Sequence, residues 1–343
     1  MRGHRGEPTL KDVIHRLAVL VGLIVACSAP PAATPSASLS PTLPPASPAP
    51  TSTASPTPPS IATPIPLPNV AQVSAPSGAV VWAIVGGTRL FRSTDRGDTW
   101  QERPLPAEPI NGQVSFVGDR EGWESIVGSP ATGCQAQLVT IWHTADAGST
   151  WQQLAGNGLG FNGCKGALQF ADRSTGYLAA YRPLLIYFTV TGGSSWASSG
   201  PFSDPPGFTT AAGAHELVPA ALRAFGTVVL ADVMGQSIHY AYRSSDGGAT
   251  WRYASAASNQ LDPIAFVTAT RWLQISAPGA SKETTDAGAT WHAFTTDYQQ
   301  AAPVVPAITF GDAQVGYATA RGAIQRTIDG GAHWTAIHTP GTF

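Results

Sequence analysis

The sequence predicts an all-β fold, a six-bladed β-propeller. Three observations lead to it: a short turn motif recurs six times, a pair of strands with an aromatic residue precedes most copies, and no segment has the periodicity of a long helix. Each copy ends in a tryptophan, at positions 100, 151, 196, 251, 291 and 334. The steps of 51, 45, 55, 40 and 43 residues are close to the length of one four-stranded blade. A seventh blade without the motif, made from the end of the spacer or from residues 198–217, stays open as an alternative.

The motif has the composition of a self-contained turn. In its first copy, RSTDRGDTW at residues 92–100, the side chains of Ser93 and Asp95 can bond backbone groups one to three residues away. Gly97 supplies a backbone conformation that a Cβ would oppose. Trp100 begins the next strand and offers a large apolar surface for packing between neighbouring sheets. We therefore expect one such turn and one such anchor in each blade.

The recurring positions are assigned a structural role in every copy. Five copies are well formed, and the sixth has Thr191 in place of the aspartate. The aspartates are spread one per blade and are satisfied by their own turns, so they cannot converge on a substrate or on calcium. The residues at the aspartate, glycine and tryptophan positions are Asp95, Gly97, Trp100, Asp146, Gly148, Trp151, Gly193, Trp196, Asp246, Gly248, Trp251, Asp286, Gly288, Trp291, Asp329, Gly331 and Trp334.

These residues resemble the Asp-box, or BNR, repeat, whose pattern is S/T-x-D-x-G-x-T-W. The resemblance extends over the region after residue 70. The group includes sialidases, sortilin-type receptors, some endoglucanases and photosystem II assembly factors, and the strand pairs before the motif are most similar to the last of these. The resemblance implies a propeller with each Asp-box turn between strands C and D of its blade. It implies little about chemistry, because this fold carries unrelated functions.

The first 26 residues have the pattern of a bacterial export signal. Four basic residues precede an apolar run at 17–26 that is too short to span a bilayer. The run ends in IVAC, which resembles the lipobox of lipoproteins and makes Cys27 the expected lipidation site. We expect an exported protein, lipid-anchored to the outer side of the cytoplasmic membrane or cell envelope. An ordinary signal peptide and an uncleaved anchor are the alternatives, and both would still export the domain.

This pattern divides the chain into three expected segments. Residues 1–26 are the expected lipoprotein signal peptide, 27–69 the lipidated cysteine with a spacer, and 70–343 the propeller. The spacer has no Lys, Arg, Asp or Glu after the cysteine and is rich in Pro, Ser, Thr and Ala, so it cannot bury a core. At roughly 3 Å per residue it reaches on the order of 100 Å, which would hold a domain clear of a membrane.

Two further cysteines, Cys134 and Cys164, are expected to form a disulfide. By strand direction they lie on the same face of adjacent blades, and an exported domain folds in an oxidising compartment. Two unpaired thiols are the alternative. Neither cysteine has the spacing of a metal ligand and the histidines are scattered, so we expect no metal and no cofactor.

The charge of the sequence limits the classes of molecule that we expect as binding partners. The formal net charge is −2, and Lys165 and Lys282 are the two lysines after residue 70, so a basic stripe for nucleic acid and a polybasic patch for membranes are excluded. We expect a monomer that contacts a membrane only through its lipid. Its expected partner is a protein or a glycan.

Long loops on the face opposite the Asp-box turns are the candidate binding region. The longest is 198–216, and segments 129–137 and 155–166 lie nearby. A merely solvated connection is the alternative for these loops. The candidate binding residues of the longest loop are Phe202, Asp204, Phe208, His215 and Glu216.

Catalysis is the less favoured function. A sialidase-like glycoside hydrolase would need three converging arginines, and those expected near the loop face are Arg89, Arg103, Arg182 and Arg321. The Arg-Ile-Pro signature that resembles the first sialidase arginine is absent, and no pair of carboxylates of the glycosidase type is evident. We therefore expect a membrane-tethered, non-catalytic binding or assembly module. A purely structural envelope protein is a third alternative.

Overall fold

The structure is a computed structural model that describes residues 71–106, 112–208, 216–257, 262–276, 279–298, 307–320 and 323–342. The expected signal peptide, Cys27 and the spacer lie outside the described residues, as do His215 and Arg321. No helix in the described part of the chain is both long and apolar enough to cross a membrane.

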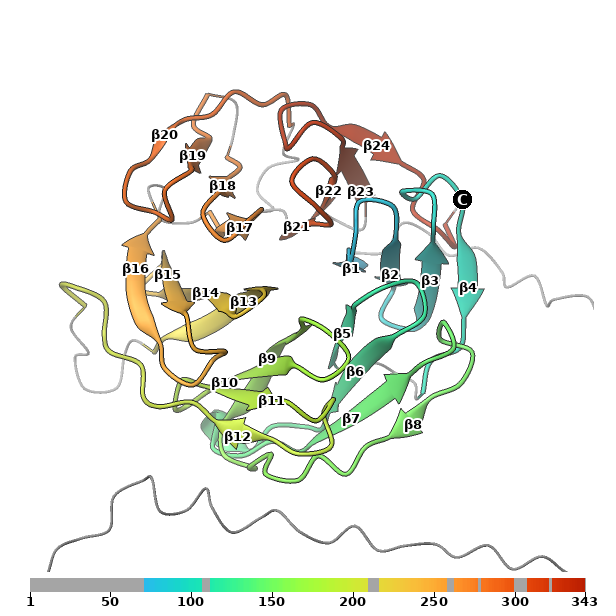
Figure 1. Ribbon diagram of the computed structural model, residues 1–343, viewed down its shortest axis with the longest axis vertical. Coiled ribbons are helices and arrows are strands. Elements are labelled where there is room, and N and C mark those ends of the chain that lie inside the picture. The colour runs from blue at the N-terminus through green and yellow to red at the C-terminus, as the bar shows by residue number, and fades with distance from the viewer. Residues whose placement is uncertain are drawn as a thin grey trace, which may run out of the picture. The chain divides into compact units, whose positions relative to one another are not determined.

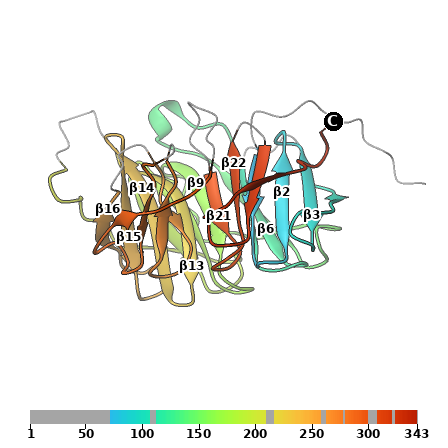
Figure 2. The same cartoon turned by 90° about the horizontal axis from the view of Figure 1, so that it is seen from above.

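The described residues form 24 β-strands in six four-stranded antiparallel sheets, arranged as the blades of a ring (Figure 1). Each blade uses four strands that follow one another in the chain, which we call A to D from the axis outward. Figure 2 shows the ring edge-on. The fold is the all-β, six-bladed propeller that the repeat predicts.

The blades have the following strands. Blade 1 contains β1 (Ala71–Ser74), β2 (Val81–Val85), β3 (Arg89–Ser93) and β4 (Gln101–Arg103). Blade 2 contains β5 (Gly112–Phe116), β6 (Gly122–Val127), β7 (Val139–Thr144) and β8 (Gln152–Gln153). Blade 3 contains β9 (Cys164–Phe170), β10 (Gly176–Tyr181), β11 (Leu185–Thr189) and β12 (Ala197–Ser198). Blade 4 contains β13 (Val218–Phe225), β14 (Val228–Gly235), β15 (Ile238–Ser244) and β16 (Arg252–Ala256). Blade 5 contains β17 (Ala265–Phe266), β18 (Trp272–Gln274), β19 (Lys282–Thr284) and β20 (His292–Ala293). Blade 6 contains β21 (Ala307–Phe310), β22 (Gly316–Ala320), β23 (Ala323–Thr327) and β24 (Thr335–Ile337).

The Asp-box motif closes the C–D turn of each blade by hydrogen bonds within the turn, to an aspartate in five blades and to Thr191 in blade 3. In blade 5, Thr290 donates its backbone N–H and its hydroxyl to the Asp286 carboxylate at 2.9 and 2.6 Å. These bonds, led by the one from the Thr290 hydroxyl, lower the pKa of Asp286 to about 2. The Thr284 hydroxyl accepts the N–H of Gly288 at 2.9 Å. The aspartate is therefore satisfied inside its own turn.

The turn also uses a feature that the sequence did not reveal. The residue directly after the aspartate position, which Thr191 occupies in blade 3, has a left-handed backbone in all six copies, even where it is not glycine, as at Ala287 with φ of 59°. Its N–H then donates to the A–B turn of the same blade, at 2.9 Å from Ala287 to the Thr270 carbonyl. The A–B and C–D turns therefore share one face of the ring, which we call the Asp-box face. The B–C turns and the connections between blades make the opposite loop face.

The core lies between neighbouring blades. Trp82 of blade 1 stacks on Phe116 of blade 2 with ring centroids 3.7 Å apart, and Trp123 of blade 2 stacks on Phe170 of blade 3 at 3.8 Å. The indole N–H of Trp82 donates to the Gly118 carbonyl at 3.0 Å, so the polar edge of the ring is also satisfied across the seam. Box tryptophans fill the outer part of these seams, as expected for interblade anchors.

The ring closes by side-chain packing between blades 1 and 6. Val81 and Phe91 of blade 1 share a buried cluster with Tyr317 and Ile324 of blade 6. No strand is exchanged in the described residues, because each sheet is made of four consecutive strands. Closure thus depends on the same apolar contact that joins the other blades.

Candidate functional site

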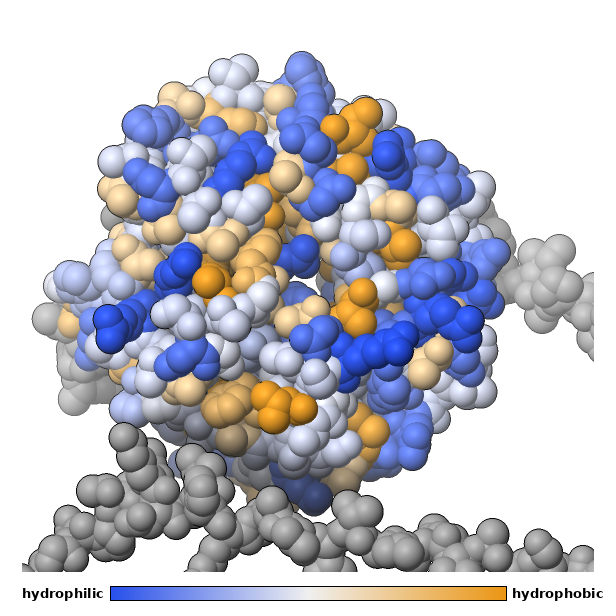
Figure 3. All heavy atoms as spheres, viewed as in Figure 1, coloured by the Kyte–Doolittle hydropathy of each residue, from blue (hydrophilic) through white to orange (hydrophobic). Residues whose placement is uncertain are grey.

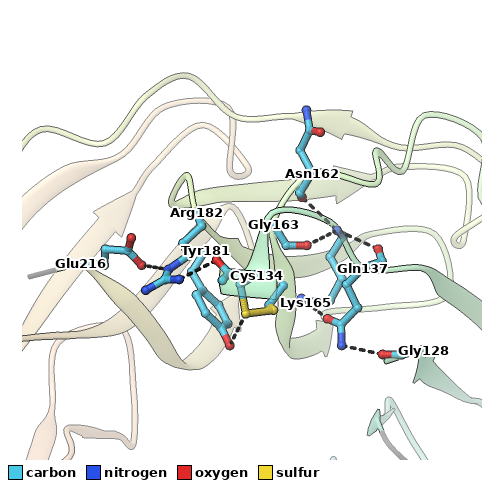
Figure 4. Close-up of a disulfide and its surroundings, with 11 residues drawn as sticks. Gly128, Cys134, Gln137, Asn162, Gly163, Lys165, Tyr181, Arg182 and Glu216 are labelled. Carbon is cyan, nitrogen blue, oxygen red and sulfur yellow. Dashed lines mark hydrogen bonds and ion pairs between the residues drawn. A yellow bond between two sulfur atoms is a disulfide. The ribbon is translucent and has the colours of Figure 1, made fainter. Parts of the chain in front are cut away.

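The loop face carries a segment of blades 2 and 3 that is cross-linked by a disulfide between Cys134 and Cys164, the pair expected from the sequence (Figure 4). Cys134 ends the short 3-10 helix η1 (Thr132–Cys134) in the B–C insertion of blade 2, and Cys164 begins β9. The two segments also hydrogen-bond through their backbones, with Gln137 N–H donating to the Phe161 carbonyl at 2.8 Å. We call residues 129–138 and 159–165 the stapled platform.

Lys165 is a buried residue that hydrogen-bonds both segments of the stapled platform. Its ammonium group donates to three backbone carbonyls, those of Asn162 and Gly163 at 3.0 Å and that of Gln137 at 3.4 Å (Figure 4). The residue is buried, and this burial lowers the pKa of its ammonium group. Because three carbonyls satisfy its three N–H donors, Lys165 has a structural role in fixing both segments.

Arg182 connects the stapled platform to the segment that precedes β13, the first strand of blade 4. Its guanidinium group, in the turn between β10 and β11, donates to the Gly133 carbonyl and forms an ion pair with Glu216 (Figure 4). Glu216 was expected in the binding loop, and the structure brings it beside the disulfide. Three separate chain segments therefore meet at this point of the loop face.

Two large apolar side chains of the platform are exposed. Leu138 and Phe161 have 62% and 63% of their surface accessible, and they line a shallow hollow of about 320 Å³ together with Pro130, Ala131 and Gln137. The sequence placed Phe161 in a candidate loop and Leu138 one residue outside another. Their exposure could not be predicted, because it depends on how the disulfide folds the two segments together.

The structure packs two of the five 198–216 candidates into the fold instead of exposing them in a binding loop. Phe202 stacks on Trp251 with centroids 5.3 Å apart, and Phe208 is buried against Tyr240 at 6.2 Å. Both phenylalanines belong to the apolar cluster between blades 3 and 4, so they stabilise the seam. Asp204 is exposed.

The arginines expected on the loop face bond separate partners. Arg89 forms two hydrogen bonds of 2.8 Å with Glu102, Arg103 donates to Gln101 at 2.8 Å, and Arg182 pairs with Glu216 as described. No hydrogen bond among the described residues directs two of these arginines at one site. The described residues also hold no group of three His, Cys, Asp or Glu side chains able to bind a metal ion.

A second hollow lies between blades 4 and 5, and sequence reasoning missed it. It has a volume of about 390 Å³ and apolar walls that include Met234, Ile264 and Ile275. Its polar groups are Asp232 and His239, whose Nδ1 lies 2.8 Å from the carboxylate. Burial is the main cause that raises the pKa of Asp232. Among the described residues, the hydrogen bonds of the His239 ring are those to the Asp232 carboxylate.

A known family matches the C-terminal part of the chain. Residues 233–341 match the family described as photosynthesis system II assembly factor YCF48. The chain is an Asp-box β-propeller similar to YCF48 over these residues. A search of curated proteins found no match.

Several solved structures are similar to the chain. A YCF48 bound to a D1 peptide is 18% identical, with a TM-score of 0.47 and coverage of 79% of this chain and 82% of that one. YCF48 from Cyanidioschyzon merolae is 17% identical, with a TM-score of 0.49 and coverage of 80% and 87%. A GH74 xyloglucanase from Xanthomonas campestris is 16% identical, with a TM-score of 0.27 and coverage of 75% and 53%.

Proposed function

We propose that the chain is a non-catalytic binding module that holds a protein partner at Leu138 and Phe161 on the stapled platform. The observation that carries this proposal is the exposure of both side chains on a segment fixed by a disulfide, a buried lysine and an arginine bridge. Exposed apolar side chains that lie together favour burial by a partner. A segment that is already rigid loses little conformational entropy on binding.

The chemistry of the hollow favours a protein over a glycan. Its lining includes Pro130, Ala131, Leu138 and Phe161. Of its two polar side chains, Gln137 bonds the Gly128 carbonyl and the Lys165 N–H through its amide, which leaves the hydroxyl of Ser129. A sugar would need several free hydrogen-bonding side chains, and an apolar side chain of a protein would not. The match of residues 233–341 to a family of assembly factors agrees with a binding role.

In the same proposal the module is exported and tethered through a lipid on Cys27, with the spacer 28–69 between the lipid and the propeller. The support is the sequence of the first 69 residues alone. Replacement Cys27→Ala tests it: the native chain is expected in the membrane fraction with a lipid-sized mass increase, and the variant in neither state. A native chain without the added mass would refute the lipid anchor.

A display experiment tests the binding surface. A library of peptides is selected for binding to the purified chain, and the selected peptides are titrated against two double variants. Leu138→Ser with Phe161→Ser is expected to weaken binding at least tenfold, because it removes both apolar contacts. The matched control is Val190→Ser with Ile328→Ser, since these residues are 69% and 59% exposed in Asp-box turns on the other face. Equal loss in both variants would contradict the proposed surface.

A further inference from the structure

The centre of the ring is a cavity of about 340 Å³ lined by the inner strands of all six blades. Figure 3 shows the molecule hollowed at this point. The lining comes from β1, β5, β9, β13, β17 and β21 and the residues beside them. Such a channel is a structural consequence of six blades around an axis. Its side chains are therefore the part that can carry a separate function.

One charged side chain, Arg223 of β13, lies among the lining residues, and none of them is an Asp or a Glu. The remaining lining side chains are amides, hydroxyls or apolar groups. The described residues thus give the channel a net positive charge. The polar lining residues besides Arg223 are Gln72, Ser74, Gln113, Gln169, Thr309 and Thr319.

The Arg223 guanidinium group has no counter-ion among the described residues. It donates one hydrogen bond, from Nη2 to the Phe310 carbonyl of blade 6, and its buried Nε has no hydrogen-bond partner. Its guanidinium carbon lies 5.8 Å from the centre of the Phe225 ring. Burial lowers the pKa of Arg223 to about 10, so the group stays charged at neutral pH. The residue is half-buried, and a charge that is partly removed from water without a partner is costly unless something else compensates it.

Other donors face the same space. Gln72 accepts the Val114 N–H on its Oε1 at 3.1 Å, which leaves its amide N–H₂ for another acceptor. The Gln113 amide and the Thr309 hydroxyl bond none of the described residues through their side chains. The channel therefore presents a cation and several neutral donors.

We propose that the axial channel binds a small oxyanion, a carboxylate or a phosphate group, through the guanidinium group of Arg223. The planar guanidinium fork matches the two oxygens of either group. The bound anion would supply the counter-charge that the described residues do not, and it would accept hydrogen bonds from the terminal N–H groups of the guanidinium.

The neighbouring hollow between blades 4 and 5 distinguishes the two anion types. It shares Ala220, Ala221, Ile264, Ala307 and Ile308 with the channel lining, so the two spaces adjoin. Its walls are mostly apolar, which suits a hydrocarbon substituent on a carboxylate. Free phosphate would leave this hollow unused.

Calorimetric titration of the full chain with inorganic phosphate, hexanoate and hexylammonium tests the proposal. Phosphate or hexanoate is expected to bind, and hexylammonium is not, because it carries the opposite charge. Tighter binding of hexanoate assigns a carboxylate with an apolar substituent, and tighter binding of phosphate assigns a phosphate group. Failure of both anions to bind, or equal binding of hexylammonium, would overturn the proposal.

Two variants make the test specific to Arg223. Arg223→Gln is expected to weaken anion binding at least about tenfold, the size of a lost charge-assisted hydrogen bond. Arg243→Gln is the matched control, because Arg243 also leaves blade 4 to donate to a backbone carbonyl, that of Ala269 at 2.9 Å. Arg223→Lys keeps the charge and is expected to retain binding in part. Anion affinity that is unchanged in a folded Arg223→Gln protein would overturn the site, whatever the outcome at Leu138 and Phe161.

Discussion

At the scale of single residues, Glu124 is a carboxyl group buried at the seam between blades. It is fully buried in β6, and neither of its carboxylate oxygens has a hydrogen-bond partner in the described part of the chain. Its cross-strand neighbours are Val114 and Trp142, which offer no charge. Burial raises the pKa of Glu124 from its ordinary value of 4.5 to about 8. The side chain is therefore protonated in the folded protein at neutral pH.

This pKa predicts a stability that falls with pH. Between pH 4.5 and 8 the unfolded chain ionises at Glu124 while the folded chain keeps its proton, so the free energy of unfolding decreases as the pH rises. Glu124→Gln keeps the shape of the protonated acid and cannot ionise. We expect it to raise the free energy of unfolding by up to about 3 kcal/mol at pH 7 and to change little at pH 4, measured by denaturant unfolding. A variant less stable than the native chain at pH 7 would contradict this reading.

The residue scale also shows what the sequence could and could not predict. The Asp-box roles followed from residue type, because each motif is satisfied within its own turn. The packing of Phe202 and Phe208 could not, since it depends on which neighbouring blade they meet. The position of Arg223 at the axis could not be predicted from the sequence either. The register of β13 shifts between Pro219 and Ala221, so alternation along the strand does not reveal which side chains face the axis.

At the scale of elements, the C–D turn of blade 3, which lacks the aspartate, shows which changes the motif tolerates. Thr191 replaces the aspartate, yet its hydroxyl still accepts the Ser195 N–H at 2.9 Å. The Thr189 hydroxyl still accepts the Gly193 N–H at 3.1 Å. A hydroxyl acceptor can therefore replace the carboxylate when the spacing and the glycine are kept, which is why all six copies could be predicted from their sequence.

Repair of this turn is expected to stabilise the protein. Thr191→Asp would accept the N–H and the hydroxyl of Ser195 together, as Asp286 does from Thr290. We expect a gain of about 0.5–1.5 kcal/mol at pH 7, seen as a higher melting temperature. Intact boxes hold their aspartate pKa near 2, so the gain should disappear as the pH falls from about 4 towards 2. A gain that persists at pH 2 would show that charge and hydrogen bonding are not its cause.

The stapled platform depends on its cross-link. The disulfide spans a sequence separation of 30 residues, for which loop entropy predicts a contribution of about 3–4 kcal/mol. We expect Cys134→Ser with Cys164→Ser to lower the free energy of unfolding by this amount and to weaken peptide binding at Leu138 and Phe161. Reductant should affect the native chain in the same way and leave the variant unchanged. Full binding by the variant would show that the platform is ordered without its disulfide.

At the scale of the whole molecule, the two faces of the ring differ in whether their features repeat from blade to blade. The Asp-box face carries turns that repeat from blade to blade, so it stabilises the fold. The loop face carries what does not repeat: the insertion of blade 2, the disulfide and the bridge from Arg182 to Glu216. The repeat therefore predicted the ring, and the departures from the repeat indicated where to look for a site. Which side chains are exposed on this face, such as Leu138 and Phe161, could be determined only from the structure.

The most direct test of the binding role is site-specific photo-crosslinking in the source cell. A photoreactive phenylalanine analogue replaces Phe161 in one variant and Val190, on the opposite face, in another. We predict that the variant at position 161 yields one discrete crosslinked protein, identified by mass spectrometry, and that the variant at position 190 does not. The absence of a product at position 161, or the same products at both positions, would contradict a partner on the stapled platform.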